Sequence, residues 1–193
     1  MISQTTSPSI SQAWVQRLCV ALQTPRLTLE PLRANHAQEV FAALQDDALY
    51  QWISNTKPVS VEALSARWLE LESRLSPDQT EAWPIWMARR HSGGACLGRV
   101  DVVLYSQQLA SNVGYYLFPP HWGQGYASEA VQAVCAHLDA CGVQEYRATV
   151  TVGNLASARV LQKASFRYTR RIPDNDRIRG VPHDDDEYVR LAT

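Results

Sequence analysis

The chain has 193 residues, a formal net charge of −1 and 46% hydrophobic residues, which suits one domain with a substantial core. A charge this close to zero gives no reason to expect a nucleic-acid partner. Because no signal peptide is recognisable and the cysteines lack metal or redox spacing, we expect reduced thiols, no metal and a cytoplasmic location. The cysteines are Cys19, Cys96, Cys135 and Cys141.

The first residues precede the main pattern of the chain. Apolar residues in 11–22, among them Trp14 and Leu18, recur at helical spacing. The segment has no basic leader and is too short and polar to cross a membrane, so we expect no membrane partner. We predict that residues 1–23 form an N-terminal extension, whose helix packs on the domain or on a partner, and that 24–193 form a single domain.

The other elements follow from the period of the apolar residues. Predicted strands cover 27–32, 84–90, 96–104, 113–118, 146–152, 166–172 and 187–191. Predicted helices cover 35–44, 60–75, 127–141 and the residues after 154, with Asn35, Ser60 and Asn154 as N-caps. The charged segment 173–186 reads as a solvated loop rather than a metal site.

The resulting order is β-α-α-β-β-β-α-β-α-β-β, an α/β fold (α+β, with a mixed sheet). A helix connects strands 113–118 and 146–152, so the right-handed crossover rule makes these two strands parallel. Hairpins join the other strands, and the sheet is therefore expected to be mixed.

A short loop with Gly123 and Gly125 connects strand 113–118 to helix 127–141. Free N–H groups and the helix dipole attract anions to a helix N-terminus, and glycine lets a ligand approach the backbone. The loop lacks the third glycine of a dinucleotide site and the lysine of a P-loop. It fits a diphosphate of another kind, bound without metal, or it is only a tight turn.

Three motifs carry a resemblance to a known family. Residues 122–130, Trp-Gly-Gln-Gly-Tyr-Ala-Ser-Glu-Ala, resemble the coenzyme A pyrophosphate loop of the GNAT superfamily of N-acetyltransferases. Residues 154–166 resemble the N-x-x-S-x-x-V-L-x-K-x-G-F segment of one branch, and 24–32 resemble its T-x-R-L-x-L-R-P-L opening. That branch includes the bacterial ribosomal-protein N-terminal acetyltransferases, and in it a Trp often opens the loop motif, as Trp122 does here.

The resemblance implies a GNAT-like fold with splayed parallel central strands that admit the pantetheine arm of acetyl-CoA, the co-substrate. The main chain of Tyr116 and Leu117 would lie along this arm, where an N–H group can polarise the thioester carbonyl. Asn154 would hydrogen-bond to the arm. The residues expected to bind the pyrophosphate portion are Trp122, Gly123, Gln124, Gly125, Tyr126, Ala127 and Ser128.

The catalytic groups depart from the family pattern. Many members carry a Tyr that protonates the leaving sulfur, and here that position is Leu161. Ser157 is the candidate donor to the sulfur, or else a helix-surface serine. Two positions where relatives carry a general-base Glu hold Thr149 and Asn112. Asp184 corresponds best to an acid near the last strand of the branch and is the candidate base.

Other sources of the base remain open. Asp101 and Glu129 are alternatives, although Glu129 can instead complement the helix dipole. A water chain, or a partner subunit in a homodimer, could also deprotonate the amine. Ser165 replaces the family's Gly, and a left-handed conformation there would cost about 1 kcal/mol, so we expect that corner to be built differently.

The predicted function is acetyl transfer from acetyl-CoA to a primary amine. A protein N-terminal amine is the first acceptor considered and a small-molecule amine the second. Because the tyrosine and both glutamates are missing, a non-catalytic acyl-CoA-binding module is the alternative. In this superfamily the region between the first two helices borders the acceptor, so Tyr50 and Trp52 either line that site or are core aromatics.

Overall fold

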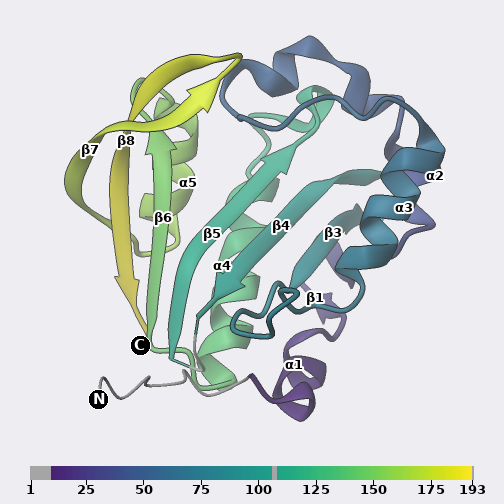
Figure 1. Cartoon of the computed structure of the whole chain (residues 1–193), viewed down its shortest axis with the longest axis horizontal. Helices are drawn as coiled ribbons and strands as arrows, with labels where there is room; N and C mark the ends of the chain where they lie inside the picture. Colours follow the sequence, from purple (N-terminus) through teal and green to yellow (C-terminus); the bar gives the residue numbers. More distant parts are fainter. Residues whose placement is uncertain (1–9, 106–107, 193) are drawn as a thin grey trace, which may run out of the picture.

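A single eight-stranded sheet organises the computed structural model, which describes residues 10–105 and 108–192 (Figure 1). In sheet order the strands are β1 (Leu22–Gln23), β2 (Leu27–Pro31), β3 (Ile85–Arg90), β4 (Cys96–Leu104), β5 (Leu109–Leu117), β6 (Glu145–Thr151), β8 (Val181–Leu191) and β7 (Arg167–Ile178). The α-helices are α1 (Gln12–Leu18), α2 (His36–Val40), α3 (Val61–Leu71), α4 (Tyr126–Ala140) and α5 (Leu155–Lys163). The mixed α/β fold is confirmed. None of the described helices is both long and apolar enough to cross a bilayer.

β5 and β6 are parallel and pair at only two positions, Leu109 with Glu145 and Ala110 with Tyr146. β5 then stays paired with β4, with an irregularity opposite Val103 and Leu104. β6 instead pairs along its whole length with β8. The two central strands therefore diverge after their first residues, and the predicted splay of the parallel pair is confirmed (Figure 1).

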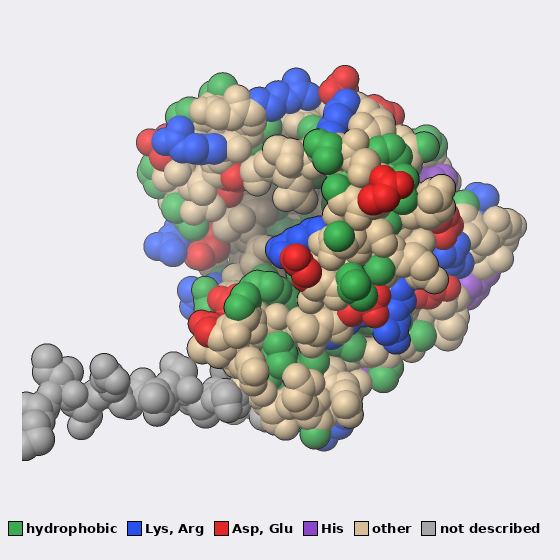
Figure 2. Space-filling view, turned by 45° about the vertical axis from the view of Figure 1, so that its right-hand side comes forward, with side chains coloured by type: hydrophobic (Ala, Val, Ile, Leu, Met, Phe, Trp, Pro, Cys, Tyr) green, Lys and Arg blue, Asp and Glu red, His purple; other side chains and the backbone are tan. Residues whose placement is uncertain are grey.

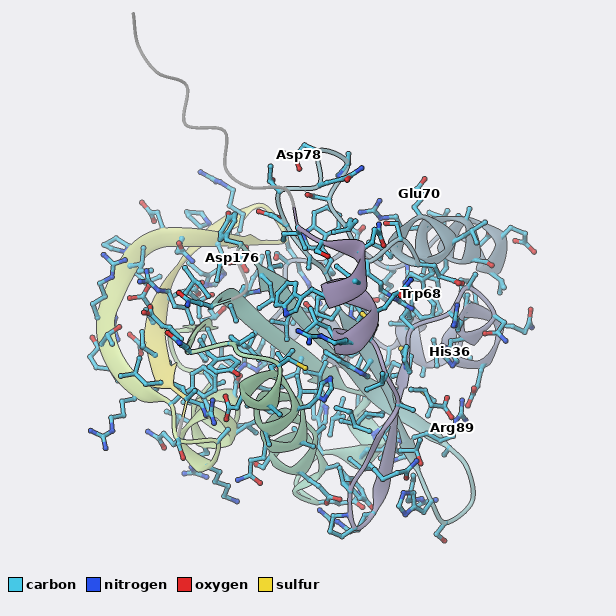
Figure 3. The ribbon with its side chains drawn as sticks, turned by 90° about the horizontal axis from the view of Figure 1, so that it is seen from below. His36, Trp68, Glu70, Asp78, Arg89 and Asp176 are labelled. Atoms are coloured by element: carbon cyan, nitrogen blue, oxygen red, sulfur yellow. The ribbon has the colours of Figure 1, made fainter. Side chains whose placement is uncertain are left out.

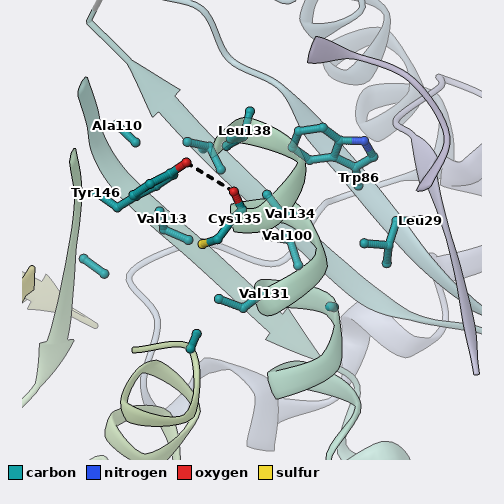
Figure 4. Packing of buried hydrophobic residues seen from close by; sticks show 14 of the residues in the cluster. Leu29, Trp86, Val100, Ala110, Val113, Val131, Val134, Cys135, Leu138 and Tyr146 are labelled. Carbon is teal, nitrogen blue, oxygen red and sulfur yellow. Dashed lines mark hydrogen bonds between the residues drawn. The ribbon is translucent and has the colours of Figure 1, made fainter. Parts of the chain in front are cut away.

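Two clusters of buried side chains lie on opposite faces of the sheet. The larger contains the inward face of α4, and Figure 4 shows Val131, Val134 and Leu138 of this helix against the strands. The smaller contains residues of α2, α3 and the 3₁₀ segments Ala43–Gln45 and Asp47–Gln51, and its largest side chain is Trp68. Each layer of helices thus covers its own face of the sheet.

An ion-pair network joins α2 to β2 and β3. Arg89 Nε donates to both carboxylate oxygens of Glu30 at 3.1 Å, and its Nη1 and Nη2 donate to Glu39 at 2.7 and 2.8 Å. His36 Nε2 lies 3.2 Å from Glu30 Oε2. Figure 3 labels His36 and Arg89 of this network. This network holds α2, and with it the wall of the smaller cluster, against the sheet.

Three local predictions are wrong. Residues 173–186 are not a loop: they belong mostly to the β7–β8 hairpin, in which opposite charges such as Arg171 and Asp186 face each other across the strands. Asn35 makes no side-chain cap, and His36 Nδ1 accepts the N–H of Arg33 instead. Ser165 does adopt φ 66° at the end of α5, despite the expected cost.

The other two predicted caps are confirmed. Ser60 Oγ accepts the N–H of Ala63 at 3.1 Å, and Asn154 Oδ1 accepts the N–H of Ser157 at 3.1 Å. Both bonds satisfy an N–H group that has no partner within its helix. The Asn154 cap fixes the start of α5, which carries Ser157.

Helix α1 packs on the domain. Trp14 and Leu18 belong to the larger cluster and are 3% and 0% exposed. Trp14 Nε1 donates to the carbonyl oxygen of Cys141 at 3.3 Å, and His137 Nε2 lies 2.9 Å from the carbonyl oxygen of Leu18. We expected this helix to pack on the domain or on a partner, and in the structure it packs on the domain.

We therefore expect Trp14→Ala to lower the free energy of unfolding by about 3–5 kcal/mol, because it removes a buried indole and leaves a cavity. Gln16→Ala, on the exposed face of the same helix, is the matched control. Urea denaturation followed by circular dichroism measures both. Equal stability of the two variants would show that α1 is not part of the cooperative fold.

Candidate active site

The loop before α4 has a backbone that favours glycine. Gly123 and Gly125 have φ of 73° and 81°, and Gly125 is the N-cap of α4 without a side-chain cap bond. Trp122 Nε1 donates to the carbonyl oxygen of Leu117 at 2.6 Å, and Gln124 Nε2 donates to that of Pro120 at 3.0 Å. These bonds fold the loop back on the end of β5. Since Gly125 has no side chain, the first turn of α4 has no side-chain cap.

Glu129 clamps this loop to the start of β2. Its Oε1 accepts from the Thr24 hydroxyl at 2.6 Å and from the Arg26 N–H at 2.9 Å, and its Oε2 accepts from Arg26 Nε at 2.6 Å. Arg26 Nη1 in turn donates to the carbonyl oxygen of Gln124 at 3.0 Å, and its guanidinium lies 4.4 Å from the Tyr126 ring centroid. Glu129 thus has a positioning role here, and both its oxygens are occupied.

Burial alone would raise the pKa of Glu129, but the hydrogen bonds from Thr24 and Arg26 outweigh it and hold the pKa below the usual value. Its contribution to stability is therefore complete above the ordinary carboxyl pKa and is lost as the pH falls through the lowered folded value. At neutral pH the carboxylate is ionised and the clamp is formed.

The resemblance of this loop to a coenzyme A pyrophosphate site predicts that Glu129→Gln weakens CoA binding about tenfold, because the loop loses charge-assisted hydrogen bonds that orient Arg26. Glu145→Gln is the control, since that carboxylate pairs with Arg147 on β6. Calorimetric titration with CoA compares the two variants. An unchanged affinity in Glu129→Gln would mean that the loop needs no clamp.

A cavity of about 240 Å³ occupies the space between the diverging strands. Tyr115 and Tyr116, adjacent on β5, both line it from opposite faces: Tyr115 bonds to α5, whereas Tyr116 packs with the smaller cluster. The cavity therefore passes through the sheet from the α5 side to the α3 side. Figure 2 shows the surface hollowed here, with acidic and basic side chains on the walls.

Ser157 and Tyr115 form a hydroxyl pair on the α5 side of the cavity. Their hydroxyl oxygens lie 2.7 Å apart, and Tyr115 also donates to the carbonyl oxygen of Ser157 at 2.8 Å. Burial strongly raises the pKa of Tyr115, although the bond from Ser157 opposes this. The phenol therefore stays protonated at neutral pH. Either hydroxyl can donate in this pair, so Ser157 can donate to a group in the cavity when the phenol proton turns to Ser157 Oγ.

The position at which many family members carry the proton-donating tyrosine is buried in this chain. Leu161 is fully buried in the larger cluster, so a phenol there could not reach the cavity. The sequence reasoning missed Tyr115, which brings a phenol to Ser157 from β5. The sequence does contain a signal for this phenol. Adjacent residues in a strand face opposite sides of the sheet, so the Tyr115-Tyr116 pair places one phenol on each face.

Three carboxylates line the cavity: Asp101, Asp176 and Asp185. Asp101 lies 3.1 Å from Arg99 Nε and occupies the space that a side chain at position 114 would fill, 2.8 Å from a Cβ built on Gly114. Asp185 is 3% exposed, its Oδ2 accepts from Asn175 at 2.8 Å, and its Oδ1 has no hydrogen-bond partner within the described part of the chain.

Asp176 is less constrained than the other two. Its Oδ1 accepts the N–H of Arg177 at 2.7 Å, and among the described residues it forms no ion pair. The candidate base Asp184 lies outside the cavity, and its Oδ1 accepts the N–H of Asp174 at 3.1 Å. Strand alternation explains the difference, since Asp184 and its neighbour Asp185 point to opposite faces of β8.

Several of the other predicted residues also line the cavity between the strands. Tyr116, Asn154, Asn112 and Thr149 line the cavity, whereas Leu117 and the loop residues 122–128 are not among its lining residues. Trp52 borders the cavity and Tyr50 an adjoining one. No group of three or more His, Cys, Asp or Glu residues that could hold a metal occurs within 10–105 and 108–192.

The sequence profile of the acetyltransferase (GNAT) domain matches residues 26–167. The chain belongs to the GNAT acetyltransferase family. It is accordingly an N-acetyltransferase that uses acetyl-CoA as the acetyl donor. The family assignment made from the three sequence motifs is confirmed.

Several known proteins are similar to this one. It is 24% identical over 169 residues to YoaA of Bacillus subtilis, an uncharacterized N-acetyltransferase, covering 86% of this chain and 94% of YoaA. RimL, a ribosomal L7/L12 alpha-N-protein acetyltransferase solved with coenzyme A, superposes with a TM-score of 0.77 at 18% identity, covering 89% and 97% of the two chains. The microcin C7 self-immunity acetyltransferase MccE, solved with acetyl-CoA and AMP, gives 0.71 at 15% identity, covering 87% and 93%. These structures share the fold.

Proposed function

We propose that the protein acetylates a primary amine, and that the acceptor is the N-terminal amine of a protein. The observation that carries this proposal is the cavity through the sheet, which brings the Ser157–Tyr115 pair and three carboxylates to the same space. Acetyl transfer needs both substrates held together in one cleft. The names of two structural neighbours support the choice of acceptor: RimL, and the ribosomal-protein-S5-alanine acetyltransferase of Vibrio fischeri (TM-score 0.77).

Acetyl-CoA would bind along the α5 side. Its pyrophosphate would meet the first-turn N–H groups of α4 and the loop from Trp122 to Ser128, whose backbone Arg26 holds through the carbonyl oxygen of Gln124. The pantetheine would enter between β5 and β6, beside Tyr116, Leu117 and Asn154. The thioester sulfur would then lie near Ser157.

The acceptor would enter from the α3 side as an ammonium ion attracted by the carboxylates. Asp176 accepts its proton in this proposal, because Asp101 is already neutralised by Arg99. The free amine attacks the thioester carbonyl carbon and the C–S bond breaks. The second proton, which the nitrogen loses on becoming an amide, passes to the departing thiolate, to which Ser157 donates a hydrogen bond, so that CoA leaves as the free thiol. Tyr115 holds Ser157 in place and stays protonated.

The acceptor class is tested by thiol release from acetyl-CoA, with mass spectrometry of the product. The panel contains peptides with a free N-terminus and no lysine, the same peptides blocked at the N-terminus with one lysine added, and small-molecule amines. We expect only the first group to be acetylated efficiently. Preferential turnover of small amines, or of lysine side chains, would overturn the proposed acceptor.

Ser157→Ala should lower kcat about 10- to 100-fold and leave the KM for acetyl-CoA nearly unchanged. The reason is that its hydrogen bond strengthens only as charge develops on the sulfur. Tyr115→Phe should give a smaller fall in kcat, because it removes only the support of Ser157. Steady-state kinetics with one acceptor compare both variants, and an unchanged kcat in Ser157→Ala would show that the serine is structural.

Two neighbouring strands offer a matched pair of acids for testing the base. Asp176→Asn should lower kcat/KM at least about tenfold and remove the acidic limb of its pH profile, because the cavity loses its proton acceptor. Asp184→Asn, outside the cavity, should have little effect. The reverse result would restore Asp184 as the base.

A further inference from the structure

A second, larger cavity of about 350 Å³ adjoins the one between the strands. Four residues line both cavities: Ile53, Asn55, Arg99 and Tyr116. The second cavity lies on the α3 face of the sheet, the face from which the acceptor enters. Its volume is within the range of small-ligand pockets, roughly 300–1,000 Å³.

Most of the residues that line this second cavity are apolar, and its polar atoms come from the backbone and from side chains such as Asn55 and Thr56 at its edge with the first cavity. The apolar residues include Leu49, Tyr50, Leu64, Trp68 and Leu71, all members of the smaller cluster or packed against it. The Tyr50 hydroxyl donates to the carbonyl oxygen of Leu44 at 2.8 Å. The phenol is therefore already satisfied and offers the cavity its ring rather than a hydrogen-bonding group.

The charged groups of the second cavity are already neutralised. Arg67 Nη1 lies 2.7 Å from Glu70, and Arg99 Nε lies 3.1 Å from Asp101 while its guanidinium lies 5.3 Å from the Tyr116 ring centroid. Each arginine thus already has a carboxylate partner. The carboxylates face the neighbouring cavity, so the two spaces together complement a cation at one end and an uncharged apolar group at the other.

We infer that the acceptor carries a large apolar group next to its amine, and that the second cavity binds this group. For a peptide acceptor, the first residue is then one such as Leu, Ile, Phe or Met rather than Gly, Ser or Asp. This inference rests on the proposed function, because it takes the cavity between the strands as the place of the amine. The specificity-determining residues are those of the apolar wall, with Leu64 and Trp68 on α3.

The expected preference is large. A pocket of this kind discriminates by about 10- to 100-fold in kcat/KM between a side chain that fills it and one that leaves it empty. A charged first residue is rejected more strongly, because its desolvation is not compensated by any free opposite charge in the second cavity.

The test uses peptides that differ only in the first residue: Leu, Phe, Gly, Ser and Asp. We expect the Leu and Phe peptides to exceed the others by at least about tenfold in kcat/KM. Leu64→Trp, which fills the cavity from α3, should remove this preference by lowering kcat/KM for the Leu and Phe peptides to the level of the Gly peptide, with CoA affinity unchanged. Leu69→Trp is the matched control, since Leu69 lies on the same helix and is 63% exposed.

Two outcomes separate this inference from the proposed function. Equal turnover of all five peptides, or a preference for Gly, Ser or Asp, overturns the apolar pocket while the acetyltransfer stands. If no peptide is acetylated, calorimetry with the Leu and Ser peptides in the presence of CoA decides. Selective binding of the Leu peptide, lost in Leu64→Trp, supports the pocket although the proposed acceptor fails, and binding of neither or both equally overturns it.

Discussion

The structure depends on the way that β5 and β6 pair. The crossover through α4 makes them parallel neighbours, yet they share hydrogen bonds at only two positions. β6 then uses its other edge to pair fully with β8. The backbone groups that face the gap lose a strand partner, and a space opens through the middle of the sheet where two substrates can meet.

Elements far apart in the sequence complete the walls of this space. Trp52 lies against the β6–α5 turn, with its ring 3.5 Å from a Cβ built on Gly153. Arg179, at the tip of the β7–β8 hairpin, donates to the carbonyl oxygen of Asp47 at 3.5 Å. The segment before α3 thus contacts both the β6–α5 turn and the hairpin, and its residues 52–55 form one wall of the cavity.

Local sequence signals predicted seven of the eight strands of the described chain at least in part, together with the main helices and the glycine loop, because each depends on residues close together in the chain. The short β1 was missed. The parallel pair followed from the crossover rule. Residues 173–186, which extend β7 and β8, escaped prediction because their alternation is among charged residues, so no apolar period marks the strand. For the same reason Asp185 could not be told from Asp184. The meeting of Tyr115 and Ser157, 42 residues apart, is set by tertiary packing, which no local pattern records.

In the proposed mechanism the acetyl donor and the amine meet in the gap between β5 and β6. A crystal structure of the complex with CoA tests this arrangement. We expect the pantetheine to lie between these two strands, with its sulfur within hydrogen-bonding distance of the Ser157 hydroxyl. A pantetheine bound elsewhere on the surface, or a sulfur separated from Ser157 by the width of the sheet, would contradict it.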